Sequence, residues 1–514
     1  MSATTGAGQP EADASAQLAS LGYTSEFKRD MGPWANFSLG FTYLSPVVAI
    51  YTMFAFGLAT AGPPMIWSLV IAGVGQLLVA LVFSEIVAQY PVAGGVYPWA
   101  RRLWGRRYAW LNGWVYMVAL FVTIASVVSG AGPYIASLFG FEASVDTVIL
   151  CSLGILALAT LINSLGTKVL AQAAIIGFAA ELIGALAVGG WLLMTERHHN
   201  LGILFDNFGA GDGTNYLWAF AAAALIGIYN YYGFEACGDV AEEVRDPGRM
   251  IPKAMRRTIY VGGAAATFVA VALALSVVDI RGVISGENPD PVSGILNEAF
   301  GTAGAKGVLV IVLLSFLSCT ISLQAAAGRL AYSYGRDDMI VGSRLLRKFS
   351  ARRRVPPYAV VLSGLVPAAV VLGSKFSEDA LTKIVSFASL GIYLGFQMVV
   401  FAALRARLKG WQPSGAYRLG KWGLPVNIAA LVYGITGIVT MAWPRTPEAP
   451  WYDNYIVLLS GAVVVGLGLL YMAIHPAYGR SDAPYDDAIP KGGPAAVVSE
   501  PRADEPKADE PTGV

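Results

Sequence analysis

Residues 37–59 of this 514-residue chain read FSLGFTYLSPVVAIYTMFAFGLA, an apolar run with a proline near its middle. A helix needs about 20 predominantly apolar residues to cross a bilayer. Pro46 has no backbone donor and clashes with the preceding turn, which costs about 3 kcal/mol inside an ordinary helix. The stretch therefore predicts a membrane-spanning helix that is interrupted near Ser45, Pro46 and Val47, either by a simple proline kink or by an unwound segment.

The composition of the whole chain agrees with this prediction. Hydrophobic residues make up 55% of the chain and charged residues 13%, whereas about 25% of a soluble chain is charged. So few charges cannot cover a core of this size, so the apolar excess must face lipid. The 35 basic and 34 acidic residues nearly balance and there are 3 cysteines, which disfavours a nucleic-acid partner and a disulfide scaffold.

Twelve apolar runs are long enough to span a bilayer, and they predict an all-α integral membrane protein. The segment 1–36 before them is expected to be cytosolic, and the segment 475–514, rich in Pro, Asp and Glu, is expected to be a disordered tail. The predicted spans cover residues 37–59, 65–89, 109–138, 146–163, 168–194, 216–238, 254–278, 306–334, 357–374, 380–404, 424–443 and 453–474.

The basic residues predict the orientation of these spans. With the N-terminus inside, 29 Lys and Arg lie at cytosolic ends and 6 at external ends. Because cytoplasmic loops are enriched in Lys and Arg, this asymmetry predicts that both termini are cytoplasmic and that the protein resides in the cell membrane.

A second interruption is expected in the sixth span. The run Tyr229, Asn230, Tyr231, Tyr232, Gly233, Phe234, Glu235 puts polar groups and a glycine at mid-depth. Spans 1 and 6 each begin a set of five, and interruptions at matching places in two halves indicate an inverted-repeat transporter with its site at the midplane. The sequence thus predicts a ten-helix core at 37–405, with repeats at 37–194 and 216–405, followed by two further helices at 424–474.

Two acidic residues stand out because they lie within spans. They are Glu181 in the fifth span and Glu235 in the sixth. A charged group at the bilayer centre costs about 2.5–3.5 kcal/mol on insertion scales, so such residues normally face a bundle interior or a water cavity. A structural hydrogen bond from a protonated acid is the alternative role for each.

Three segments resemble signatures of a known family. YPVAGGVY at 90–97, followed by Gly105 and Gly113, is similar to the P-x-x-G-G-x-Y motif of amino acid permeases. The run YYGFEACGDVAEEVRDPGRMIP at 231–252 and the run AGRLAYSYGRDDM at 327–339 resemble two motifs of the amino acid–polyamine–organocation superfamily. The resemblance implies the leucine-transporter fold and a secondary transporter, not an enzyme, for amino acids or related amines. For the loop after the second motif, we expect Glu242 and Glu243 to form salt links with Arg245, Arg249 and Arg257.

The resemblance also shows where this chain departs from its relatives. Family members commonly carry a glycine-rich break in helix 1 whose amides receive the substrate carboxylate, whereas Pro46 offers no donor. A substrate whose α-carboxylate is displaced or absent fits this change, with tyrosine faces and Glu235 receiving an ammonium group. The alternative role for the three tyrosines is packing, because only one or two of them can face a cavity. The substrate-binding residues are thus predicted to be Ser45, Pro46, Val47, Tyr229, Asn230, Tyr231, Gly233 and Glu235.

Coupling is predicted at either of two places. Sodium-linked members of the fold use hydroxyls of helix 8, here Ser315 and Ser318. Some proton-linked members carry a lysine in helix 5, where this chain has Glu181, and a buried acid that exchanges protons favours proton-coupled uptake. Sodium symport, amino acid or polyamine exchange, and a receptor that does not carry its ligand remain alternatives. No cofactor or metal is expected, and the partners are a small-molecule substrate and the lipid bilayer.

Overall fold

The computed structural model describes residues 9–24, 26–211, 215–376, 380–444, 450–479 and 481–490. Within these ranges the chain is helical, with two isolated β-bridges and no strand. Among the described residues, eleven helices, or pairs of helices in line, are long and apolar enough to cross a membrane, and Tyr216–Asn230 is a shorter apolar segment. The protein is therefore a multi-pass membrane protein. The part of the predicted disordered tail at 491–514 lies outside the described residues.

The first span consists of two helices, α2 (Pro33–Leu44) and α3 (Pro46–Ala61), separated by one residue. Ser45 has φ 42° and ψ 86°, in the left-handed region. Proline disfavours the right-handed helical conformation in the residue before it and is well suited to the first position of a helix. Ser45 thus ends α2 and also begins α3, where its hydroxyl accepts a hydrogen bond from the Val48 N–H at 3.3 Å.

The next four spans are uninterrupted helices joined by short turns. Between the second and third spans, Gly94 and Gly95 have φ values of 90° and 47° and turn the chain into a short helix. The elements are α4 (Ile66–Gln89), α5 (Val96–Trp104), α6 (Arg106–Phe139), α7 (Val145–Asn163) and α8 (Thr167–Thr195).

The second half of the chain contains the other interrupted span. The predicted span 216–238 is divided into three short helices, α9 (Tyr216–Ala223), α10 (Leu225–Asn230) and α11 (Ala236–Asp239). A π-helical turn at Thr258–Gly262 joins α12 to α13, and α15 is bent at Gly301, where φ is 61°. The remaining helices are α12 (Pro247–Arg257), α13 (Gly263–Ser276), α14 (Ile280–Ser285), α15 (Pro291–Arg336), α16 (Ser343–Leu346), α17 (Pro357–Gly373), α18 (Ala380–Leu408), α19 (Gly423–Ala442), α20 (Trp451–Asn454) and α21 (Ile456–Ile474).

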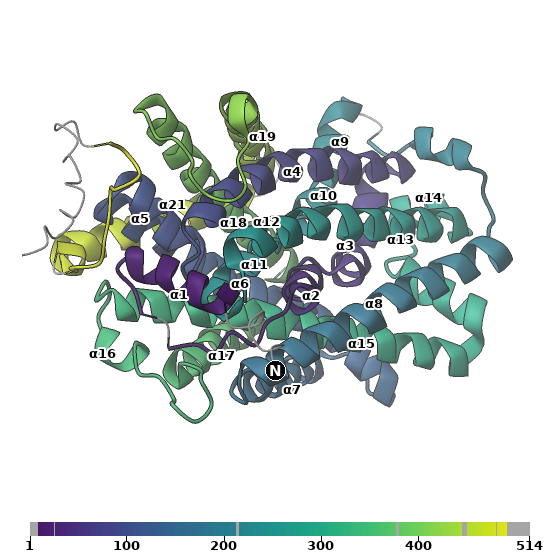
Figure 1. Ribbon diagram of the computed structural model, residues 1–514. Coiled ribbons are helices and arrows are strands. Elements are labelled where there is room, and N and C mark those ends of the chain that lie inside the picture. Colours follow the sequence, from purple (N-terminus) through teal and green to yellow (C-terminus); the bar gives the residue numbers. More distant parts are fainter. Residues whose placement is uncertain are drawn as a thin grey trace, which may run out of the picture.

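The breaks in both interrupted spans are buried, at Ser45 and at residues 231–235. In Figure 1, α2 and α3 lie in the middle of the bundle and α9 lies at its edge. Helix α2 contacts α8, α12 and α15, and α3 contacts α9, α10 and α13. In Figure 1 the short helices α1 (Gln9–Ser20), α5 and α16 lie at one end of the long helices, and α14 lies at the other. Packing on all sides keeps the broken backbone away from lipid, where unpaired amides could not be tolerated.

The chain after α21 differs from the predicted disordered tail. Residues 481–490 lie against α5, whose Arg101 donates to the carbonyl of Ala483 at 2.6 Å and to the hydroxyl of Ser481 at 2.8 Å. Arg102 forms an ion pair with Asp487. Composition predicted disorder here, but the two buried arginines of α5 supply donors that order this part of the tail.

Candidate functional site at two broken helices

Glu181 of α8 closes the break in the first span. Its carboxylate Oε1 accepts hydrogen bonds from the Ser45 hydroxyl at 2.6 Å and from the Val47 N–H at 3.0 Å. The side chain is fully buried, and the first N–H groups of a helix have no partner within the helix. The predicted residues Ser45, Val47 and Glu181 are thus brought together, although 134 positions separate Val47 from Glu181.

Glu235 forms equivalent hydrogen bonds at the break in the sixth span. Its Oε2 accepts from the Gly233 N–H at 2.8 Å, and its Oε1 accepts from the hydroxyl of Tyr116 on α6 at 2.9 Å. Gly233 has φ 117°, a conformation that L residues rarely adopt. Each interrupted span therefore carries a buried carboxylate on one of its free backbone amides.

The two breaks touch each other. A Cβ at Gly233 would lie 2.5 Å from the Leu44 backbone nitrogen and 2.9 Å from the Tyr43 carbonyl carbon. The rings of Tyr43 and Tyr232 meet edge to face with centroids 6.4 Å apart. Only glycine allows the end of α2 to approach the turn after α10 this closely.

The three predicted tyrosines point in different directions. The Tyr229 hydroxyl shares a hydrogen bond of 2.9 Å with Ser126 of α6, and the ring of Tyr232 packs between those of Tyr43 and Tyr229. Tyr231 instead lines a groove between α4 and α13, where Gly73 and Gly263 leave room for its ring. Tyr229 and Tyr232 therefore lie beside the breaks, and Tyr231 packs between two helices.

Asn230 ends α10 and is the polar residue next to the second break. Its side-chain amide is fully buried, and neither its nitrogen nor its oxygen has a hydrogen-bond partner among the described residues. Burying an unpaired amide costs about 1–3 kcal/mol. The protein therefore retains unused hydrogen-bonding capacity at this position.

The two hydroxyls of the eighth span that were predicted to hold sodium lie in α15 and form hydrogen bonds within that helix. Ser315 donates to the carbonyl of Ile311 at 3.1 Å, and Ser318 donates to the carbonyl of Ser315 at 3.0 Å. The neighbouring Cys319 thiol donates to the carbonyl of Tyr43 at 3.3 Å, beside the first break. Thus α15 touches the break through a thiol, a poor ligand for a hard cation.

The three signature segments meet in one buried ionic network. Glu243 accepts from Arg329 of α15 at 2.8 and 3.1 Å, and Glu242 accepts from Arg336 at 2.7 Å. Asp337 accepts from the hydroxyls of Tyr97 at 2.8 Å and Tyr23 at 3.2 Å. Burial and then the charge of Asp337 raise the pKa of Tyr23, so its hydroxyl stays protonated and donates.

This network corrects an expectation from the sequence. Glu242 and Glu243 bind Arg336 and Arg329 of α15, not Arg245, Arg249 or Arg257. The predicted partners are close in sequence, but the fold brings up arginines more than 80 positions away. The motif pattern contained a signal for this pairing, because Arg329 and Arg336 belong to the third signature.

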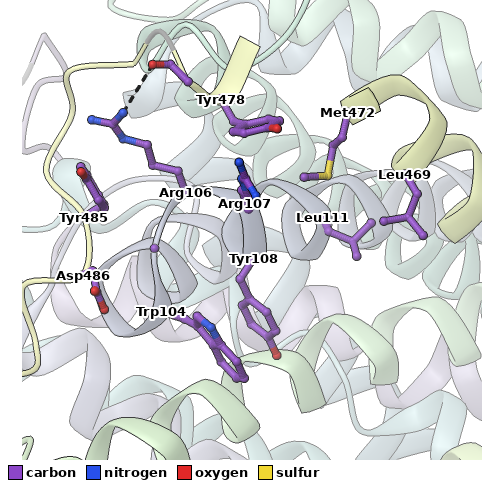
Figure 2. Close-up of a pocket in the computed structure, with 12 residues that line it drawn as sticks. Trp104, Arg106, Arg107, Tyr108, Leu111, Leu469, Met472, Tyr478, Tyr485 and Asp486 are labelled. Atoms are coloured by element: carbon purple, nitrogen blue, oxygen red, sulfur yellow. Dashed lines mark hydrogen bonds between the residues drawn. The ribbon is translucent and has the colours of Figure 1, made fainter. Parts of the chain in front are cut away.

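One small cavity lies beside the first break, and a larger hollow lies at the start of α6. An apolar cavity of about 10 Å³ beside the first break is lined by Val47, Gly184, Val188, Val269 and Val312, and it is at the lower limit for one water molecule. A hollow of about 710 Å³ lies between α6, α21 and the ordered part of the tail. Figure 2 shows Arg106, Arg107 and Tyr485 around this second space, which contains none of the predicted site residues.

The two adjacent histidines after α8, His198 and His199, have different surroundings. His199 Nε2 bonds the carbonyl of Val277 at 2.8 Å. His198 lies near Glu196 and Glu298, with one ligand atom of each within 4.8 Å of the others. Two of these three groups are exposed, so the cluster resembles an ordinary solvated acidic surface.

Buried carboxylates at two discontinuous helices inside an apolar bundle define a membrane transporter of the broken-helix class. The family model described as "Amino acid permease" matches residues 32–467. The chain belongs to the amino acid permease family.

Curated relatives are similar over almost their full length. Amino-acid permease BAT1 of Arabidopsis thaliana is 28% identical over 89% of this chain and 94% of its own length. Its homologue in Oryza sativa is 27% identical over 84% of this chain and 87% of its own length. A putative amino acid/polyamine transporter of Macrophomina phaseolina is 23% identical over 79% of this chain and 92% of its own length.

Proposed function

We propose that this protein is a secondary active transporter that carries an amino acid or a related organic amine across the cell membrane, with protons driving uptake. The observation that carries the proposal is the pair of buried carboxylates, Glu181 and Glu235, each bound to an amide at a helix break. Among the described residues neither carboxylate has an ion-pair partner. Family membership and the names of the relatives support the substrate class.

Proton coupling fits the chemistry of Glu181. A buried acid without a cation can be neutralised by a proton from one side of the membrane and lose that proton to the other side as access alternates. Sodium coupling has less support, because Ser315 and Ser318 direct their hydroxyls to their own helix. Exchange of one substrate for another is the second candidate, since it needs the same two breaks and no ion.

Uptake into proteoliposomes tests the transport function. With the interior alkaline, we expect labelled amino acid or amine to accumulate above its external concentration, and a protonophore to abolish the accumulation. Accumulation driven by a sodium gradient at equal pH would contradict the proton mechanism. Binding without any uptake or exchange would instead indicate a receptor.

The same proposal includes the membrane architecture. We propose twelve spans arranged as a 5+5 inverted repeat, with α9–α11 together forming the sixth span. An even number would put both termini on the same side of the membrane, and the excess of Lys and Arg supports the cytoplasm as that side.

Reporter fusions test this topology. A reporter after Val514 and a second one inserted beside Asn207, between α8 and α9, are expected to give signals from opposite sides of the membrane. Both sites lie outside helices predicted to span the bilayer, so insertion is not expected to disturb them. Equal signals from the two sites would contradict the seven spans, an odd number, that we propose between Asn207 and the tail.

A further inference from the structure

The donors at the break in the first span are all used by the protein itself. Pro46 has no N–H, the Val47 N–H donates to Glu181, and the Val48 N–H donates to the Ser45 hydroxyl oxygen. The next amide, of Ala49, donates to the carbonyl of Ser45 at 3.1 Å. A carboxylate from a ligand would therefore find no free amide at the start of α3.

Charge at the break also opposes a second carboxylate. Glu181 is fully buried, its Oε2 has no hydrogen-bond partner among the described residues, and the cavity beside Val47 is lined by apolar side chains. Whenever Glu181 is ionised, a ligand carboxylate here would meet a like charge in a medium of low polarity, where repulsion is stronger than in water. It could bind only by displacing Glu181 from Val47.

The groups at the other break favour a ligand that is a cation and a donor. Glu235 is a buried acid that accepts from Gly233 and Tyr116. Asp239, one turn further along, has both carboxylate oxygens without a hydrogen-bond partner among the described residues. The Asn230 amide is unused, and the rings of Tyr43 and Tyr232 present aromatic surface nearby. Carboxylates and aromatic rings attract an ammonium group.

We propose that the carboxylate of Glu181 occupies the place of a substrate carboxylate at the break between α2 and α3. Substrates are therefore bound chiefly through their amino group. The proposal rests on the proposed transport function and adds a rule of specificity to it. An amine that lacks the α-carboxylate binds about as well as the corresponding amino acid. Removing the Glu181 side chain frees the Val47 N–H, which can then donate a hydrogen bond to the carboxylate of a substrate.

Equilibrium binding to the full-length protein in detergent tests this rule with two matched pairs, L-leucine with isopentylamine and L-arginine with agmatine. In the wild-type protein we expect the affinities within each pair to differ by less than about threefold. In Glu181→Ala we expect the ratio of amino acid to amine affinity to rise by about tenfold or more, because the freed Val47 amide can donate to the charged carboxylate of the amino acid and not to the amine. Ile183→Ala, on the exposed face of the same helix, is the control and should leave the ratio unchanged.

Glu181→Gln serves if Glu181→Ala does not fold, since glutamine keeps the shape and removes the charge. It should shift the ratio in the same direction by a smaller factor. A wild-type protein that binds each amino acid at least tenfold more tightly than its amine, with a ratio unchanged in both variants, would overturn this inference alone. If the wild-type protein binds and transports none of the four compounds, that result would instead count against the proposed function.

Discussion

Glu181→Gln is expected to reduce accumulation driven by a pH gradient to background while exchange of preloaded substrate stays within about twofold of wild type. Glutamine can still accept from the Ser45 hydroxyl and the Val47 N–H, which Glu181 holds at 2.6 and 3.0 Å. It cannot bind or release a proton. The break between α2 and α3 is therefore preserved, and only the coupling of transport to protons is lost.

Two flux assays on the same proteoliposomes measure this prediction. The first follows uptake with pH as the only driving force, and the second follows exchange at equal pH on both sides. Ile183→Ala controls for expression and reconstitution, because Ile183 lies on the same helix and is 66% exposed. If Glu181→Gln still concentrates substrate with a pH gradient alone, Glu181 is a structural hydrogen-bonding group and coupling must be sought at Glu235.

Gly233→Leu is expected to reduce transport to below about 1% of wild type while the protein still inserts into the membrane. The position has φ 117°, and even a Cβ would lie 2.5 Å from the backbone nitrogen of Leu44. Strained backbone of this kind costs about 1–3 kcal/mol, and the clash is with main chain that cannot rotate away. The end of α2 must therefore move away from the turn after α10, which separates the two breaks.

Initial uptake rates and gel-filtration profiles together test this prediction. Gly154→Leu is the matched control, because no atom lies within 4 Å of a Cβ built at that position on α7. Gly233→Ala should produce an intermediate loss, since alanine adds the Cβ that clashes with Leu44 but none of the further carbons of leucine. Wild-type uptake by Gly233→Leu would show that transport does not need the close contact between the two breaks.

Much of the fold follows from local chemistry and could be predicted. Apolar runs must be helical in lipid because each backbone amide needs a partner there, and the long helices appear where these runs occur. Pro46 alone predicted a kink or a break in the first span, and the matching interruption in the sixth span favoured the break. The break after Asn230 was predicted from a glycine and polar groups at a depth where helices carry apolar residues.

The candidate site could be predicted only in part. Glu181 and Glu235 were identified as unusual because their burial is costly wherever their partners lie. The sequence did not reveal that Glu181 binds the Val47 amide, because that pairing depends on how α8 packs against the first span. Nor did the sequence show that Tyr231 points away from the two breaks. A helix break removes the regular periodicity that would place side chains on one face.

The amino acid sequence by itself determined the membrane class, where the long apolar helices lie, the two interruptions and the family motifs. These features depend on residue polarity and on backbone geometry within a few positions. Only the tertiary structure decided that Glu243 binds Arg329, that residues 481–490 pack on α5, and that a buried acid occupies the amide at the first break. Such contacts join residues far apart in the chain, and their energies depend on distances that helix packing alone sets.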